Sequence, residues 1–553
     1  MGAKGSRWPL VAAVTAMVAV AAGVRLAGLN WGLPTAHRLF SYHPDEGPLL
    51  GAVANMLQSG DWNPHFFNYG TLYLYLVAIP SGLASLVLEG SWTRLFVIGR
   101  VLTVTLGVLT VLVVYATGKQ IGGWRLGLAA GWTMALLPMH VLHSHFATVD
   151  VPATFFVALA LLAAAKITTQ AEFPWYLVGG MAVGLGAATK YGAGLAVVAL
   201  VVAHVLGVGE GRHREPPHEW LYVALMIALL AFLAGCPYAI EFRGGVPGLG
   251  RDFVHDVSFE LGHMRQGGTY AFIGVGNGWA YHLARSLGAG LGYPLLLLAL
   301  AGMVLAVASR GRPAGPPVVF GLACFVTAGL GKEYFMRYLM PLTPVVAVWA
   351  ANLVVATGES LLGPKRAGAA PVPPGGKALP SGRQRLGAGL VALVALAAWG
   401  VTAWYAVAQL WPLAAPDARA VAGRVLLESD QRIALADPPW FYTPDITPYN
   451  GGAMTAGQAR ADRRLVITEW ETQKLVARRP GMAAVSDLES ADLVRLGRPQ
   501  VLAYLDALRT RYQVVGSYET AVPEPRIGPG KLQCPPDWLY ARPRITLYRL
   551  KGG

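Results

Sequence analysis

The chain has 553 residues, of which 54% are hydrophobic and only 13% are charged, and its formal net charge is +14. Soluble proteins carry roughly 25% charged residues, so the composition excludes an ordinary soluble enzyme and predicts a polytopic α-helical membrane protein. In a membrane protein, an excess of basic residues is typical of cytoplasmic loops. The chain has no basic run interleaved with aromatic residues, so the sequence does not predict nucleic-acid binding. The three cysteines have no spacing typical of a disulfide framework or a CxxC metal site.

Apolar segments of about 20 residues, the length that crosses a bilayer, recur along most of the chain. The first follows the basic sequence MGAKGSRW and lacks a good cleavage site, so we interpret it as an uncleaved membrane helix with a cytoplasmic N-terminus. About eleven transmembrane helices are predicted, at 9–28, 95–117, 126–142, 150–166, 175–190, 192–208, 219–236, 283–308, 317–331, 340–357 and 386–410.

Residues 71–88 are also apolar and long enough to span. Charge decides between the alternatives, because every short basic loop falls on the cytoplasmic side only if this segment lies in the membrane interface. Those basic loops are 118–125, 209–220, 309–313 and the linker 358–385. The outer face then holds a first loop at 29–94, a short loop at 143–149, the turn around Lys190, a second long loop at 237–282 and the segment 332–339.

The C-terminal part of the chain differs in composition from the membrane module at 1–357. The linker 358–385 is rich in Pro and Gly, so it should be flexible and cytoplasmic. After the last span, 386–410, residues 411–553 should form a small extracytoplasmic α/β domain. Its predicted elements are a helix at 417–430 and strands at 432–437, 464–470, 512–518 and 544–550.

The stretch SYHPDEGPLL (41–50) holds the first acidic residues of the chain, Asp45 and Glu46, at the start of an amphipathic segment. Acidic residues in a first helical turn oppose the helix dipole favourably, which is a sufficient structural explanation for the pair. Carboxylates at a membrane boundary are nevertheless costly unless they are solvated, paired or used. A carboxylate here could also accept a proton from an attacking hydroxyl.

A third carboxylate, Asp150, lies at another outer boundary in the sequence HSHFATVDVPATFF. Pro152 behind it is typical of a helix start, so Asp150 could simply be a helix cap. His143 and His145 precede it, and His43 precedes the first acidic pair. These groups could bind substrate at one outer face, or they could hold a divalent metal ion, and neither spacing decides between the two.

Cations lie on the same predicted face. Lys190 is in GAATKYGAG, and Lys332, Arg337 and Tyr338 are in GKEYFMRYLMPLTP. Snorkelling at span ends is the ordinary explanation for such Lys and Arg residues. A phosphorylated lipid also needs cations at this depth, and the Arg fork suits a phosphate. Acids and cations on one face therefore predict a site for a sugar on a phospholipid carrier, with the cations at the leaving phosphate.

Three further residues are weaker candidates. Tyr69 could stack on a sugar, although most interfacial aromatic residues are belt residues. His255 and His263 lie in the loop 237–282, which could cover the site, although a surface histidine is more often inert. We expect His263 to contact substrate.

The motifs YHPDEGPLL, ATVDVPATFF, ATKYGAG and FMRYLMPLTP, in this order, resemble the GT-C membrane glycosyltransferases across residues 1–360. The resemblance is to the family 39-like group that contains protein O-mannosyltransferases and the lipid A aminoarabinose transferase. It implies a GT-C fold. It also implies transfer of a hexose or pentose from a polyprenyl-phosphate donor to a protein, lipid or glycan acceptor at the outer face of the inner membrane.

In that family pattern Asp45 matches the first-loop catalytic acid, Glu46 is its neighbour, and Asp150 matches the acid of the second outer loop. Arg337 matches a cationic position before the tenth span. Many members have a lysine near the positions of Asn68 and Tyr69, and here Lys190 or Lys332 could take its place.

The mechanism expected from this pattern is a single displacement with Asp45 as base, which inverts the anomeric configuration. A transporter of lipid-linked sugars is the competing hypothesis. It should show internal repeats and broken helices with polar residues at mid-membrane, whereas here the ionisable residues lie at one face. A binding module on a membrane anchor is a third alternative, but an anchor does not need so many spans.

Overall fold

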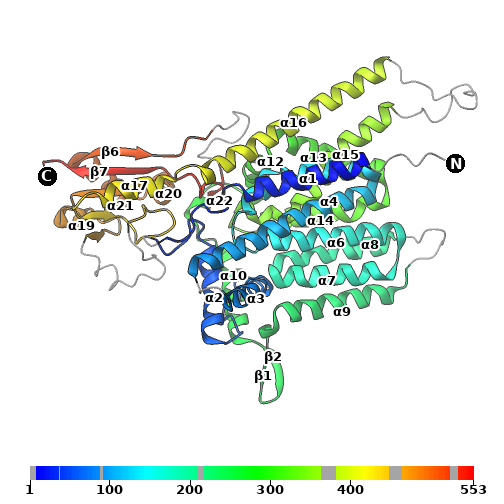
Figure 1. Cartoon of the computed structure of the whole chain (residues 1–553), viewed down its shortest axis with the longest axis horizontal. Helices are drawn as coiled ribbons and strands as arrows, with labels where there is room; N and C mark the ends of the chain where they lie inside the picture. Colours follow the sequence, from blue (N-terminus) through cyan, green and yellow to red (C-terminus); the bar gives the residue numbers. More distant parts are fainter. Residues whose placement is uncertain are drawn as a thin grey trace, which may run out of the picture.

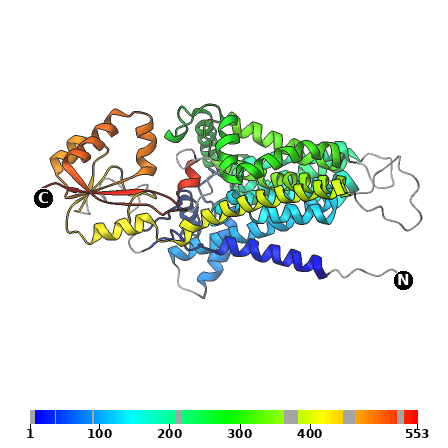
Figure 2. The same cartoon turned by 90° about the horizontal axis from the view of Figure 1, so that it is seen from above.

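The computed structural model describes residues 8–35, 38–87, 91–207, 216–362, 382–446, 464–522 and 534–552. Most of the molecule is a bundle of roughly parallel helices, and a small α/β domain lies at the end of the bundle remote from the start of the first helix (Figures 1 and 2). Two predicted basic loops lie partly outside the described residues, at 208–215 and 363–381.

Within the described residues, eight helical segments are long and apolar enough to cross a membrane. Their main helices are α1 (Trp8–Leu26), α4 (Trp92–Ala135), α6 (Asp150–Gln170), α9 (His218–Gly235), α13 (Tyr293–Arg310), α14 (Gly315–Leu330), α15 (Thr343–Leu362) and α16 (Gly382–Ala414). Two shorter apolar helices, α7 (Phe173–Thr189) and α8 (Val197–Leu206), pack with them. The predicted polytopic helical fold is confirmed, and the number of eleven spans stays a prediction.

Helix α4 contains two of the predicted spans. It is interrupted at Gly122 and at Gly123, whose φ of 83° is a backbone conformation that favours glycine. The chain doubles back at this turn. The two segments lie so close that a side chain added to Gly118 would meet Leu126, and one added to Gly127 would meet Tyr115. The predicted basic loop 118–125 is therefore a tight glycine turn between two antiparallel helical segments.

Two predicted span boundaries are wrong, and proline explains both. The segment predicted at 126–142 leaves the helix after Ala135 and resumes as α5 (Pro138–His143), since the residue before a proline disfavours helical geometry. The segment predicted at 283–308 is interrupted at Gly292, between a helical stretch that ends at Leu291 and α13, which begins at Tyr293. Gly292 has a φ of 80°, and Pro294 occupies the first turn of α13.

The end of the bundle that faces the C-terminal domain carries the two long loops (Figure 1). The first contains α2 (Glu46–Ser59) and α3 (Leu72–Ser85), which pack on each other and on α4. Helix α3 has 14 residues, so it is about 21 Å long and too short for a hydrocarbon core of about 30 Å. This length accords with the interfacial helix predicted at 71–88.

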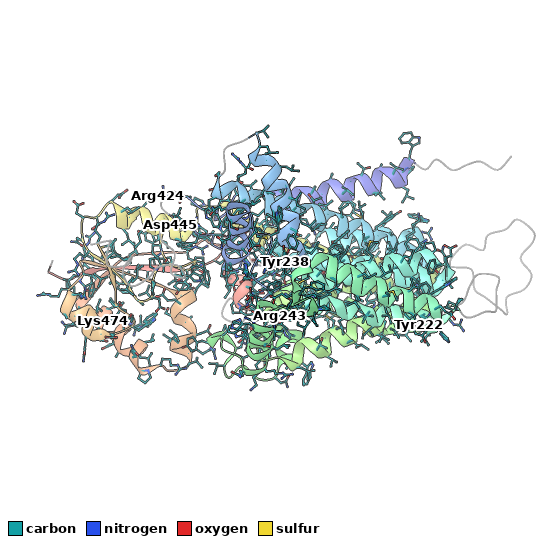
Figure 3. All side chains as sticks on the ribbon, turned by 90° about the horizontal axis from the view of Figure 1, so that it is seen from below. Tyr222, Tyr238, Arg243, Arg424, Asp445 and Lys474 are labelled. Atoms are coloured by element: carbon teal, nitrogen blue, oxygen red, sulfur yellow. The ribbon has the colours of Figure 1, made fainter. Side chains whose placement is uncertain are left out.

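The second long loop follows α9, whose residue Tyr222 lies near the opposite end of the bundle in Figure 3. Tyr238 and Arg243 lie toward the half of the bundle that faces the C-terminal domain in the same view. The loop contains a hairpin and several short helices: β1 (Ile240–Arg243), β2 (Val246–Leu249), α10 (Arg251–Gln266), α11 (Gly278–Tyr281) and α12 (Leu287–Leu291). Short 3₁₀ or π turns complete the bundle: η1 (Tyr191–Ala196), η2 (Pro237–Ala239), η3 (Tyr270–Phe272), η4 (His282–Ser286), η5 (Arg312–Ala314) and η6 (Met336–Leu342).

The C-terminal domain has the predicted small α/β architecture. Its five-stranded sheet has the order β4-β3-β5-β7-β6, with β4, β3 and β5 parallel and β7 antiparallel to both its neighbours. The strands are β3 (Ile433–Leu435), β4 (Leu465–Ile467), β5 (Met482–Ser486), β6 (Tyr512–Tyr518) and β7 (Ile545–Leu550). The helices are α17 (Ala418–Leu427), α19 (Thr472–Arg478), α20 (Asp487–Arg495), α21 (Pro499–Arg511) and α22 (Pro536–Leu539).

A polar interface joins this domain to the first outer loop. The ring of Tyr42 lies between the guanidinium groups of Arg38 and Arg419, each 3.7 Å from the ring centroid. The Tyr42 hydroxyl donates a hydrogen bond of 2.7 Å to Asp445, and Arg38 forms a 3.0 Å ion pair with the same carboxylate. The interface places the C-terminal domain directly beside the segment that leads into α2.

Candidate active site

The first predicted acid lies just before α2 and faces a cation from a distant part of the chain. Asp45 Oδ2 is 3.2 Å from Nη2 of Arg337, which lies in η6 at the start of the α15 segment. The Asp45 side chain is 20% exposed, whereas that of Arg337 is 7% exposed. The carboxylate is thus paired but still open to a substrate.

The third predicted acid is paired in the same way. Asp150 begins α6 and accepts a hydrogen bond of 2.6 Å from Nζ of Lys190, which separates α7 from η1. The Lys190 ammonium lies 5.1 Å from the ring centroid of Tyr338 and 5.8 Å from that of Tyr69.

Tyr338 connects the two ion pairs. Its ring centroid is 5.8 Å from the guanidinium carbon of Arg337 and 5.1 Å from the Lys190 ammonium. Cations within about 6 Å of an aromatic ring are attracted to its face. An uninterrupted series of contacts therefore leads from Asp45 through Arg337, Tyr338 and Lys190 to Asp150.

A cavity of about 340 Å³ lies between the bundle and the C-terminal domain, with Asp45 and Arg337 in its wall. The bundle and its second loop contribute one side, and α20, α22 and their neighbours contribute the other. The remaining lining residues are Pro44, Thr269, Tyr270, Ala271, Phe335, Phe441, Leu488, Glu489, Asp492, Leu493, Pro536 and Tyr540.

The neighbour of Asp45 has a different environment. The Glu46 side chain is fully buried and receives two hydrogen bonds from Arg100, of 2.8 and 2.7 Å, and one of 2.7 Å from the backbone N–H of Ala147. Ser41 also donates to it. Burial alone would raise the pKa of Glu46, but the charge and hydrogen bonds of Arg100 outweigh burial and lower it. Glu46 fixes the start of α2 against α4.

Sequence reasoning missed one central carboxylate, Asp537 of the C-terminal domain. It is fully buried, and its two oxygens accept hydrogen bonds from the backbone N–H groups of Met336 and Arg337, at 3.1 and 2.9 Å. The same carboxylate lies 3.8 Å from Nη1 of Arg337. The motif CPPDWLY gives no signal for this contact, because the partner lies about 200 residues away in the chain.

The three predicted histidines are all buried. His43 packs against Phe146 at 4.4 Å between ring centroids, and burial lowers its pKa. Nε2 of His143 is 3.9 Å from Asp537, yet burial lowers its pKa to about 4. Both ring nitrogens of His145 contact backbone carbonyl oxygens. The structure places His43 and His143 beside the site, and their contact with substrate stays a prediction.

The remaining candidates lie at the outer rim. Lys332 is exposed, and its backbone N–H donates to the carbonyl of Met264 in α10. His263 lies 3.7 Å from the buried carboxylate of Glu333, and His255 is exposed beside Asp256. Among the residues that the structure describes, no three His, Cys, Asp or Glu side chains group closely enough to hold a metal ion.

Comparison with known proteins gives a family match for part of the chain. Residues 92–237 match the family described as dolichyl-phosphate-mannose-protein mannosyltransferase. This region contains α4, α6 and α7, and with them Asp150 and Lys190. No curated protein sequence matches the chain.

Solved structures are similar over most of the chain. One is the oligosaccharyltransferase AglB from Archaeoglobus fulgidus in complex with an inhibitory peptide and a dolichol-phosphate; it is 12% identical, covers 94% of this chain and 74% of its own, and has a TM-score of 0.54. The same enzyme with Zn and sulfate is 13% identical, with 92% and 72% covered and a TM-score of 0.52. ArnT from Cupriavidus metallidurans is 16% identical, with 97% of both chains covered and a TM-score of 0.49.

The family match covers residues 92–237, and the similar solved structures show a shared fold. With eight apolar helical segments among the described residues, the chain is an integral membrane protein.

Proposed function

We propose that this membrane glycosyltransferase transfers a hexose or pentose from a polyprenyl-phosphate donor to a protein, lipid or glycan acceptor at the extracytoplasmic face of the cell membrane. In a single displacement, an acceptor hydroxyl oxygen attacks the anomeric carbon while the bond from that carbon to the phosphate oxygen breaks. Asp45 takes the hydroxyl proton, and polyprenyl phosphate leaves with the bonding electrons. The anomeric configuration is inverted.

The observation that carries this proposal is the contact between Asp45 and Arg337 in the wall of one cavity. A base must reach the acceptor proton, and a cation must lie near the oxygen on which charge develops. The two side chains come from distant parts of the chain. Each places a charged group in a cavity wall that also contains four aromatic rings. The archaeal AglB structure, which contains a dolichol-phosphate, supports a phosphorylated lipid as the donor.

Phosphate binding by Arg337 is supported by its unused hydrogen-bonding capacity. Its Nη1 atom is buried and makes no hydrogen bond within the described residues. Asp537 lies 3.8 Å from this atom, which is an ion-pair distance beyond hydrogen-bond range. A phosphate oxygen would supply the hydrogen bond that this buried donor lacks. Lys190, which contacts Tyr338, would extend the cationic surface toward Asp150.

Acceptor selection is proposed for the parts that cover the cavity. Arg495 of α20 donates to the carbonyl oxygens of Ile273 and Tyr270, both at 2.8 Å, and so connects the C-terminal domain to the second outer loop. Loops and added domains commonly determine specificity on a shared scaffold. Deleting 411–553 should therefore impair acceptor use more than binding of the donor lipid.

The test of the catalytic role is transfer by Asp45→Asn from a supplied polyprenyl-phosphate sugar. The variant keeps the shape of the side chain and removes the base. Turnover should fall by roughly 10²- to 10⁴-fold, while affinity for the donor lipid and thermal stability in detergent stay close to those of the unmodified protein. Asn is also a good residue at a helix start, so activity near that of the unmodified protein would make Asp45 a structural residue.

A further inference from the structure

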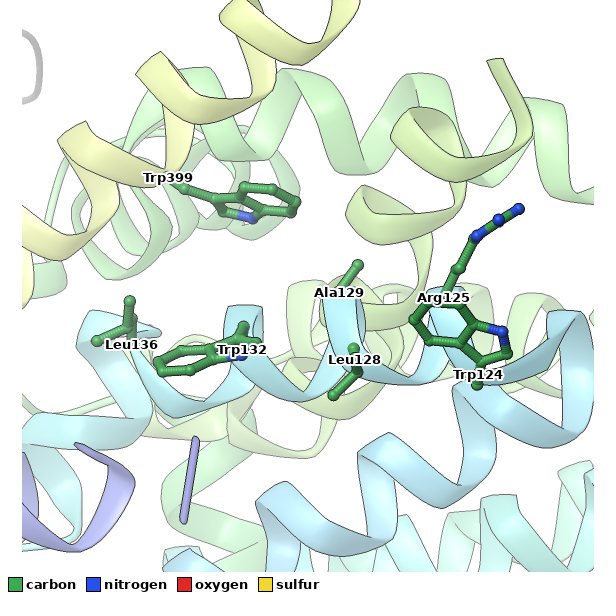
Figure 4. A pocket seen from close by; sticks show the side chains of 7 residues that line it. All are labelled: Trp124, Arg125, Leu128, Ala129, Trp132, Leu136 and Trp399. Atoms are coloured by element: carbon green, nitrogen blue, oxygen red, sulfur yellow. The ribbon is translucent and has the colours of Figure 1, made fainter. Parts of the chain in front are cut away.

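An apolar groove lies outside the candidate active site, between the second segment of α4 and the membrane helix α16 (Figure 4). Its volume is about 420 Å³. The lining residues are Trp124, Arg125, Leu128, Ala129, Trp132, Leu136 and Trp399. Every one of them except Arg125 is apolar or aromatic, so the groove suits a hydrocarbon chain.

The walls of the groove are fixed by contacts within the protein. Trp399 on α16 and Trp132 on α4 lie on opposite sides of the groove, and Ala129 leaves space between the helices (Figure 4). The indole N–H of Trp399 donates a hydrogen bond of 3.0 Å to Oγ1 of Thr133. This bond holds the ring in place, so the groove does not depend on a freely rotating side chain.

The length of the groove corresponds to one leaflet of a bilayer. It extends along α4 from Trp124 to Leu136, a separation of about 18 Å at 1.5 Å per residue. The hydrocarbon core is about 30 Å thick, so one leaflet accounts for about half of that. An acyl chain that enters at the Trp124 end would lie in the groove along most of its length.

Cations gather at that same end. Arg125 is exposed, and its guanidinium lies 5.3 Å from the ring of its neighbour Trp124. The glycine turn before it also brings Lys119 and Arg310 close, since side chains added to Gly127 and Gly122 would meet them. Arg310 has an ion pair with Glu359, which leaves an excess of positive charge around the turn.

We infer that this groove is a binding site for an anionic phospholipid, with one acyl chain between Trp132 and Trp399 and the headgroup phosphate on Arg125. The predicted topology places the turn on the cytoplasmic side, where anionic lipids attract basic residues next to membrane helices. The site is remote from the C-terminal domain and is independent of the proposed sugar transfer. The lipid would hold α16, which leads directly to the C-terminal domain, against α4.

The experiment is native mass spectrometry of the full-length protein in detergent, titrated with phosphatidylglycerol and with phosphatidylcholine. The unmodified protein should retain phosphatidylglycerol preferentially. Arg125→Gln should weaken its retention roughly fivefold, the effect of one basic residue near an anionic surface. Arg312→Gln removes another exposed cation outside the groove and serves as the matched control, which should retain the lipid normally.

A second variant tests the acyl-chain position. Ala129→Phe fills the groove without removing a charge, and it should reduce retention of phosphatidylglycerol. Phosphatidylglycerol with brominated chains should quench tryptophan fluorescence more strongly in the unmodified protein than in this variant. Equal retention of the two lipids, equal losses with Arg125→Gln and Arg312→Gln, or displacement by an equimolar amount of polyprenyl phosphate would each overturn the assignment.

Discussion

Two charged clusters lie side by side where the first outer loop enters α2. The closed cluster contains Glu46, Arg100 and Ser41, and its ion pair is almost completely buried. The open cluster contains Asp45, Arg337 and Asp537, and Asp45 lines the cavity.

The difference between the two clusters shows that carboxylates on adjacent residues can have different roles. Glu46 has every oxygen occupied by protein donors, whereas Asp45 contacts one cation and a cavity. Occupied, buried carboxylates stabilise structure, and carboxylates with a free side can react. We therefore expect the closed cluster to govern stability and the open cluster to govern turnover.

Glu46→Gln should have the largest effect on stability, because it leaves the charge of Arg100 buried without its partner. Removing one partner of a buried ion pair typically costs about 3–5 kcal/mol. Thermal unfolding in detergent would measure the loss, with Asp45→Asn as the matched amide substitution one residue away. A melting temperature lowered equally by both substitutions would contradict the distinction between the two clusters.

Low pH should destabilise the protein through the same residue, Glu46. The folded pKa of Glu46 is lowered, so its contribution to stability is present above the unfolded pKa of about 4.3 and is lost as pH falls through the lower, folded pKa. Melting temperature should therefore decrease in this acidic range. The decrease should be smaller in Glu46→Gln, and an unchanged acid profile in that variant would assign the effect to other groups.

Arg337→Ala should weaken binding of the donor lipid. Losing a charge-assisted hydrogen bond typically costs about 1.5–3 kcal/mol, so the dissociation constant for a polyprenyl-phosphate sugar should rise by roughly one to two powers of ten. Equilibrium binding to detergent-solubilised protein would measure the change. Arg265→Ala, on an exposed residue of α10 outside the cavity wall, is the control, and equal weakening by both would favour a general surface-charge effect.

Asp537→Asn should have a smaller effect than Arg337→Ala. The amide oxygen can still accept one backbone hydrogen bond, but the charge that faces Arg337 is removed. We expect the Michaelis constant for the donor to rise by up to about tenfold, within the range of a single hydrogen bond to a charged group. Steady-state kinetics at varied donor would test this, and a change in stability with unaltered kinetics would make Asp537 purely structural.

The smallest expected effect is that of His143 on the rate of transfer between pH 6 and 8. Burial holds the pKa of His143 at about 4, so this ring is neutral throughout the range from pH 6 to 8. The rate of transfer should show no inflection from His143 in that range, and His143→Gln should leave the shape of the pH profile unchanged. An inflection near pH 6.5 that disappears in His143→Gln would show that the ring takes up a proton during turnover.

Much of the fold could be predicted, because the thickness of the bilayer sets the length of each membrane helix and the charge of each loop can be counted from the sequence. Hydropathy located the spans near 9–28 and 150–166, and the charge argument selected an interfacial helix where α3 lies. Local turn chemistry was harder to predict, so the start of α13 at Tyr293 was missed. Strand β5 was missed because its sequence, MAAVS, is short and contains a single strong strand former, Val485.

The candidate site was predicted in part. Asp45, Asp150, Lys190 and Arg337 were expected on one outer face, because the predicted topology places each in an outer loop or at the outer end of a span. The structure connects them through Tyr338. The buried partners could not be predicted in this way. Pairing of Arg100 with Glu46 and of Asp537 with the Arg337 segment depends on tertiary contacts, which leave no periodic pattern in the sequence.

The stacking of Tyr42 between Arg38 and Arg419 has a consequence for how substrates enter. Any swing of the C-terminal domain away from the bundle would have to separate the contact between Arg419 and Tyr42 and break the bonds of Asp445 to Tyr42 and Arg38. A hinged lid is therefore a poor description of this domain. The edge of the domain beside Tyr42 should therefore stay in place during turnover. We expect substrates to enter the cavity by movement at its opposite side, where Arg495 contacts η3.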